Sequence, residues 1–397
     1  MKKNLLYLFT VLCTLSFFTA CSDDDDDVKV LEGVNASFNG ETLDLKYSGS
    51  PLLGKEVAFD TKDGQTATIT MQGTLDLSAI SGLFGGGSKA NLPAISYAPG
   101  VIPGEVTTTL SNVVLTQVGE TYTFEGTDEA NGRTVKYTGE VKKDKMTLAL
   151  DVTMPTNDLV GSWNVAPIIE SDDWGGAYKS QPINVTWEAE PELEVFPGWS
   201  MPMNTIVNLA LVMPVKGELN AHKLLQRVFE SVDFRADGNV VASYSDGDNI
   251  AAPQWQTSPL NIAHYCVKDG KIFLYLNPDM IIKNITSKAT KAGMENLPIA
   301  EMLTELLPML SEGIPVAYTL NEGKLYTYAD TELMLKLLNL LTPMLENEEF
   351  IKEIVDAVKS TPDMESFAPM LESMLKQLPG IVAGTTKLEA GINFIKE

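Results

Sequence analysis

The side chains of this chain that could do chemistry are two histidines, one cysteine beyond the N-terminal region and many carboxylates. His222 and His264 lie far apart in the sequence, and neither belongs to a pair with metal-binding spacing. No Gly-x-Ser-x-Gly sequence offers a nucleophilic serine. Cys266 lies in an alternating stretch that predicts a strand, where a buried thiol is unreactive. We therefore expect no enzyme, no metal site and no cofactor; a hydrolase that uses two carboxylates stays as an alternative.

Tryptophan and methionine are the residues that could bind a ligand. Trp174 and Trp199 lie beside glycine and proline in DDWGGAY and EVFPGWSMPM, which predicts loops. Exposed indole rings can stack on sugars or apolar ligands; the alternative is that both rings pack onto the core. Methionines are concentrated in the helical part, where flexible thioethers suit an adaptable apolar lining or, alternatively, packing between helices. The methionines that we expect at such a lining are Met302, Met309, Met370 and Met374.

The N-terminal residues have the features of an export and anchoring sequence. A basic start, an apolar run and Ala20 precede Cys21, which is the order of a secretory signal peptide in residues 1–20. FTAC resembles a bacterial lipobox, which implies that Cys21 carries acyl chains and anchors the protein in a membrane. The run of aspartates that follows predicts a solvated tether over residues 21–32. The same run resembles the surface-export signal of Bacteroidetes lipoproteins, which implies exposure on the outer membrane.

The composition is that of an acidic, folded protein. The 397 residues include 53 acidic and 29 basic side chains, a net charge of −24. This charge argues against nucleic acid as a partner and against electrostatic binding to anionic lipid. A hydrophobic content of 44% suffices for real cores, and the length predicts two domains.

Two β-rich domains follow from the pattern along the chain, with PTND between them. Residues 33–154 contain short runs rich in Thr, Val and Tyr, and Asn131-Gly132 between two alternating runs indicates a hairpin. We expect an antiparallel β-domain there. In residues 158–397, strands alternate with helices. Further hairpin turns are predicted at Asp237-Gly238, Asp269-Gly270 and Glu322-Gly323.

The helices of the second domain are rich in methionine and leucine. Apolar residues recur at helical spacing in each of them. Thr361 and Gly380 have the positions of an N-cap and of a C-terminal stop for the last helix. The predicted helices cover residues 209–232, 299–310, 331–345, 347–360 and 362–378. For the first of them, a break at Pro214 or Gly217 is the alternative to one continuous helix.

Gly161-Ser162-Trp163 precedes a predicted strand and resembles the Gly-x-Trp motif of lipocalins and the wider calycin group. The resemblance implies that residues 158–397 form a calycin-like β-barrel with amphipathic helices, and that Trp163 packs across its closed end. Residues 33–154 resemble the calycin-like β-domains of Bacteroidetes lipoproteins. Taken whole, the chain resembles a family of Bacteroides surface lipoproteins of unknown function. The expected fold class is therefore mainly β with inserted helices (α+β).

These features predict a lipid-anchored protein of the outer-membrane surface that binds an apolar or amphipathic ligand. A glycan-binding accessory lipoprotein that uses Trp174 or Trp199 is the alternative. The expected partners are the membrane, through the lipid on Cys21, and either an apolar small molecule or a glycan. Nucleic acid is not expected.

Overall fold

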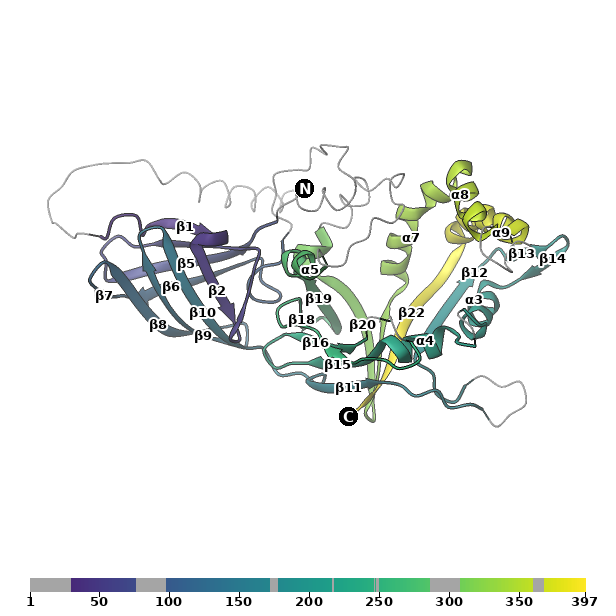
Figure 1. Ribbon diagram of the computed structural model, residues 1–397, viewed down its shortest axis with the longest axis horizontal. Coiled ribbons are helices and arrows are strands. Elements are labelled where there is room, and N and C mark those ends of the chain that lie inside the picture. The colour runs from purple at the N-terminus through teal and green to yellow at the C-terminus, as the bar shows by residue number, and fades with distance from the viewer. Residues whose placement is uncertain are drawn as a thin grey trace.

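The computed structural model describes residues 30–75, 98–171, 178–215, 218–245, 247, 250–285, 308–359 and 368–397 (Figure 1). An N-terminal part holds strands β1 to β10, and a C-terminal part holds strands β11 to β22 with the α-helices. The expectation of a mainly β fold with helices is confirmed. Cys21, Trp174 and Met302 lie outside the described residues, as does the glycine-rich stretch 82–89.

The N-terminal part consists of two sheets that share one core. The first sheet has the order β1-β4-β5-β6 and the second β3-β2-β10-β9-β8-β7. The core cluster includes Phe59 and Ile69 from the first sheet and Tyr137 and Leu148 from the second. The strands are β1 (Ala36–Asn39), β2 (Leu43–Tyr47), β3 (Ser50–Pro51), β4 (Lys55–Asp60), β5 (Thr66–Gly73), β6 (Thr107–Val114), β7 (Thr116–Val118), β8 (Thr121–Ala130), β9 (Arg133–Lys142) and β10 (Lys145–Thr153).

Alternation of apolar and polar residues forms these strands. In β5, Ile69 and Met71 are buried, whereas Thr68 and Gln72 face solvent. Asn131-Gly132 joins β8 to β9 as predicted, with positive φ angles of 54° and 78° that suit a tight hairpin. The expectation of an antiparallel domain needs one correction, because β10 pairs with β2 in parallel. The long chain between these two strands permits either direction.

The C-terminal part is built on one long sheet with the order β17-β16-β15-β11-β22-β21-β20-β19-β18. Strand β12 also pairs with β22, and β13 and β14 form a separate hairpin. Among the described strands the sheet does not close into the expected barrel, because its end strands β17 and β18 do not pair. An isolated bridge joins Asn239, just before β16, to His264 in β18. The strands are β11 (Gly161–Val165), β12 (Ile183–Ala189), β13 (Leu193–Phe196), β14 (Trp199–Met201), β15 (Phe229–Phe234), β16 (Val240–Tyr244), β17 (Gln256–Thr257), β18 (Ala263–Lys268), β19 (Lys271–Leu276), β20 (Ile314–Asn321), β21 (Lys324–Ala329) and β22 (Thr385–Lys396).

Tight turns join neighbouring strands of this sheet where the sequence predicts them. Asp269-Gly270 connects β18 to β19, and Glu322-Gly323 connects β20 to β21. Both turns place their first residue at a positive φ, 52° for Asp269 and 48° for Glu322. Asp237-Gly238 lies in the longer turn between β15 and β16. Strand β22 is the central element, because it pairs with β21 on one edge and with β11 and β12 on the other.

The segment 209–232 does not form one continuous helix; it is interrupted at Pro214, one of the two breaks that the sequence offers as alternatives. Helix α3 begins earlier and ends before Pro214, because the residue before a proline avoids the helical region; Met213 has ψ 143°. Helix α4 starts anew after Asn220, whose side chain accepts the N–H of Lys223. Phe229 then begins β15. The α-helices are α3 (Met203–Val212), α4 (Ala221–Val228), α5 (Pro278–Ile285), α7 (Thr331–Leu345), α8 (Glu348–Lys359) and α9 (Ala368–Ala383).

The last helix extends further than the sequence predicts. Gly380 does not end α9, which continues through Pro379 and Gly380 to Ala383. Ile381 and Val382 are buried, so their packing outweighs the poor helix propensity of the two residues before them. The predicted N-cap Thr361 lies outside the described residues.

Trp163 is the largest fully buried side chain of the described part. It lies in β11 within the core of the long sheet, beside Val232 and Phe394. Its indole N–H donates to the carbonyl of Leu159 at 2.7 Å, and the ammonium of Lys396 lies 5.4 Å from the ring centroid. Because its ring is buried, its N–H is hydrogen-bonded and its face contacts an ammonium group, Trp163 is a structural residue of this core.

We expect Trp163→Ala to lower the free energy of unfolding by about 3–5 kcal/mol, through lost transfer energy and the cavity left behind. Trp255, whose side chain is 40% exposed, serves as the control. Trp255→Ala should cost under about 1 kcal/mol. Urea unfolding followed by circular dichroism compares the two, and equal losses would contradict a core role for Trp163.

Candidate functional site

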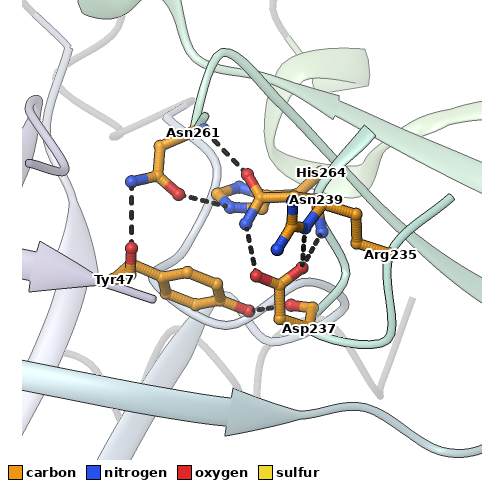
Figure 2. A network of polar contacts seen from close by, with 6 residues as sticks. All are labelled: Tyr47, Arg235, Asp237, Asn239, Asn261 and His264. Carbon is orange, nitrogen blue, oxygen red and sulfur yellow. Dashed lines mark hydrogen bonds and ion pairs between the residues drawn. The ribbon is translucent and has the colours of Figure 1, made fainter. Parts of the chain in front are cut away.

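A buried polar network joins the two β-rich parts (Figure 2). We call it the polar joint. Tyr47 comes from β2 of the N-terminal part, and the other residues come from the C-terminal part. The phenol of Tyr47 donates to the backbone carbonyl of Asp237 at 2.5 Å, which links the parts directly. The polar joint consists of Tyr47, Arg235, Asp237, Asn239, Asn261 and His264.

Asn261 makes three side-chain hydrogen bonds to the N-terminal part. Its side-chain amide donates to the carbonyls of Tyr47 at 3.3 Å, Ser50 at 3.1 Å and Pro51 at 3.0 Å. Its φ of 66° is one that asparagine tolerates better than most residues. Because an amide nitrogen carries two hydrogens, one of them is shared between two carbonyls. Asn261 is fully buried, and these bonds join β2 and β3 to the C-terminal part.

The remaining side chains of the polar joint hold Asn261 in place. Asn239 accepts the backbone N–H of Asn261 at 2.8 Å and donates its amide to Asp237 at 3.0 Å. The Asp237 carboxylate also accepts the backbone N–H of Asn239 at 2.9 Å, and Arg235 lies 3.8 Å from it. Nε2 of His264 lies 3.2 Å from the side-chain oxygen of Asn261. The network is therefore continuous from Arg235 to Tyr47.

Burial controls the charge of the ionisable groups around the polar joint. Burial, with a smaller effect of the nearby Lys55 charge, lowers the pKa of His264 to about 3, so its imidazole is neutral at physiological pH. Burial also lowers the pKa of Lys55 to about 7, although Asp279 opposes that shift. The Lys55 ammonium donates to the carbonyls of Pro99 at 2.6 Å and Gly100 at 3.1 Å.

The polar joint is better suited to structure than to catalysis. Within the described part of the chain, every buried side-chain nitrogen or oxygen of the polar joint has a hydrogen-bond partner. His264 is 6% exposed and Lys55 is 4% exposed, so a substrate cannot reach either group. The network instead satisfies the polar groups that meet where the two parts pack.

A groove of about 500 Å³ lies beside the polar joint, between residues 102–105 and 265–268. Arg133 in its wall is held by Glu105 at 2.8 Å and Asp128 at 2.6 Å. Cys266 also lines it, and burial raises the pKa of this thiol. Because the thiolate is the nucleophile, this environment does not favour covalent chemistry at Cys266.

The structure places the described candidate ligand residues in different surroundings. Met309 is buried, and Met374 packs on a small core of Leu193, Met203 and Ile381. Met370 lies in α9 and is partly buried. Met374 thus packs on β13, the partner strand of the one that carries Trp199, and packing accounts for Met309 and Met374. His222 is also buried, edge-on to Tyr178.

Trp199 lies on β14 rather than in a loop, and its side chain is 53% exposed. Phe196 on β13 is 51% exposed, and the two rings are parallel within 2° with centroids 5.7 Å apart. The Pro197-Gly198 turn between them is the tip of the hairpin. Figure 1 shows this hairpin at the far end of the C-terminal part, away from the N-terminal part. The aromatic pair therefore faces solvent.

The pair belongs to a stretch that has no charged residue. Residues 195–215, VFPGWSMPMNTIVNLALVMPV, contain no Asp, Glu, Lys or Arg, although 21% of the chain is charged. We call this stretch the uncharged segment. Its exposed large apolar residues are Phe196, Trp199, Leu209, Val212, Met213 and Val215. Sequence reasoning assigned part of it to a helix and overlooked the missing charge, which was the available signal.

No group of His, Cys, Asp and Glu side chains in the described ranges could hold a metal ion. Within those same ranges, no helix has both the length and the apolar character needed to cross a membrane. Comparison of the chain with protein-family models, with characterised proteins and with solved structures found no match.

We expect the stability of the protein to depend on the ionisation of Lys55. Above a pH of about 7, folded Lys55 is neutral, whereas in the unfolded chain it keeps its proton up to a pKa of 10.5. The unfolded state thus binds more protons in this window, so the free energy of unfolding rises with pH, by at most about 1.4 kcal/mol per pH unit.

Lys55→Met removes this rise, which urea unfolding at pH 7, 8, 9 and 10 would reveal as a smaller slope than that of the wild type. Ile69→Met serves as the control, because it changes a buried residue of β5 that has no ionisable group. Parallel pH profiles for the wild type and Lys55→Met would contradict the neutral state of Lys55.

Proposed function

We propose that this protein is a lipid-anchored binding protein of the outer-membrane surface, and that the uncharged segment binds an apolar or amphipathic ligand. One observation carries the proposal: an acidic chain has 21 successive residues without charge, and six large apolar side chains among them are exposed. Exposed large apolar side chains concentrated in one stretch of an acidic chain support an interaction site there. The buried methionines contribute little to this proposal.

Burial of the aromatic pair would supply useful affinity. Phe and Trp side chains bury about 150–250 Å² each when fully enclosed. Each ring here is about half exposed, so a ligand can remove roughly 100 Å² per ring from water. At about 25 cal/mol per Å², each ring contributes roughly 2–3 kcal/mol before the cost of association.

The proposal also includes a lipid anchor and a relationship of the fold to calycins. The lipid on Cys21 would hold the protein at the membrane, and the tether over residues 21–32 would keep the β-rich parts in solvent. A relationship of the C-terminal part to calycins is also proposed. It is supported by the buried Trp163 in β11, which is the first strand of the long sheet in chain order. Binding rather than catalysis is proposed, because the ionisable groups of the polar joint are enclosed.

A glycan is the second candidate ligand. The parallel faces of Phe196 and Trp199 support it, because sugar rings stack on exposed aromatic faces. The surrounding uncharged segment favours the apolar ligand, because few of its side chains can bond to hydroxyl groups.

A fatty acid brominated on its chain tests the apolar ligand, because bromine quenches a nearby indole. The full-length mature protein should show saturable quenching, and Trp199→Phe should lose most of it. Trp255→Phe is the matched control and should keep it, because Trp255 lies outside the uncharged segment. Phe196→Ala should weaken binding by at least about tenfold. Equal quenching of wild type and Trp199→Phe would reject this surface as the binding site.

A further inference from the structure

A second groove lies where two strands share one partner. Strand β22 pairs with β12 through residues 385–392 and with β11 through residues 394–396, on the same edge. Between the end of β11 and the start of β12 the sheet forks, and a groove of about 440 Å³ opens there. We call it the fork groove. The residues that matter in its lining are Gln181, Asn184, Asn321, Asn393, Tyr178 and Tyr326.

Three side-chain amides of the fork groove orient one another. Gln181 donates to the side-chain oxygen of Asn184 at 2.7 Å, and Asn184 in turn donates to that of Asn393 at 3.5 Å. The amide of Asn393 donates to the backbone carbonyl of Gln181 at 2.9 Å. Each amide has two N–H donors and two lone pairs, so these bonds leave capacity for a ligand. The amides are thus held in position before any ligand arrives.

Tyr326 adds an aromatic wall. Its ring stacks on that of Tyr328, with centroids 4.7 Å apart and planes within 12°. Tyr326 lines the fork groove, whereas Tyr328 lines a neighbouring groove of about 430 Å³. Each ring covers one face of the other, and Tyr326 contributes its side chain to the lining of the fork groove. Gly391, in register with Tyr328, lacks the Cβ that would clash with that residue.

We propose that the fork groove binds a short, neutral oligosaccharide. Sugar hydroxyls donate and accept hydrogen bonds, as primary amides do, and the C–H face of a sugar ring packs on an aromatic face. The volume of the groove falls within the range of small-ligand sites and suits one or two sugar rings. The charged residues of its lining are Lys179, Glu322 and Lys324, and the net charge of −24 of the whole chain disfavours an anionic ligand.

This site is separate from the uncharged segment, and its argument does not depend on the function proposed for that segment. The two surfaces share no residue. Tyr326→Ala and Trp199→Ala therefore distinguish them, because each variant removes an aromatic ring from one surface alone.

The test is titration calorimetry of the full-length mature protein with neutral gluco-, manno- and galacto-oligosaccharides of two to four units. At least one should bind with a 1:1 stoichiometry. Tyr326→Ala should weaken binding by about tenfold or more, Tyr326→Phe should keep most of it because the ring remains, and Trp199→Ala should leave it unchanged. Absence of binding by the whole panel would overturn the proposal. So would equal affinities of wild type and Tyr326→Ala, or loss of binding in Trp199→Ala.

Discussion

The side-chain amide of Asn261 is the contact on which the arrangement of this protein depends. It bonds to three carbonyls in β2 and β3 from a position 210 to 214 residues further along the chain. The bond to the Tyr47 carbonyl is buried, and a buried carbonyl without a partner costs about 1–3 kcal/mol. Asn239, Asp237 and His264 hold the amide in place. The polar joint thereby turns an otherwise unfavourable contact into a specific one.

Polar and apolar groups are distributed in an unusual way over the molecule. Charged and amide side chains such as Lys55 and Asn261 are enclosed between the parts, where they determine packing. At the far end of the C-terminal part, Phe196 and Trp199 are exposed to solvent in a stretch without charge. Packing between the two parts explains why the polar side chains are buried, but it does not explain why two aromatic rings are exposed. The functional proposal therefore rests on the uncharged segment. The amides of the fork groove define a second surface of different chemistry.

Local signals in the sequence predicted much of the fold. Asn131-Gly132, Asp269-Gly270 and Glu322-Gly323 form hairpin turns because their backbone preferences act over two residues. Predictions failed where distant packing decides: buried Ile381 and Val382 extend α9 past Gly380. Asn261 and Lys55 were not predicted, because their partners lie far away in the sequence or in another element and neither forms a motif. Trp199 was a candidate from the sequence, but its stacking on Phe196 requires the hairpin geometry.

Scanning calorimetry of Asn261→Asp tests most directly whether the polar joint makes the two parts one cooperative unit. A carboxylate cannot donate to the three carbonyls and buries an unpaired charge, which costs about 3–5 kcal/mol. Asn347→Asp is the matched control, because Asn347 accepts the backbone N–H groups of Glu349 and Phe350 at a helix start, where aspartate serves equally well. We expect one transition for the wild type and Asn347→Asp, and two separate transitions at lower temperature for Asn261→Asp. A trace of Asn261→Asp that superimposes on the wild type would contradict the central role of this amide.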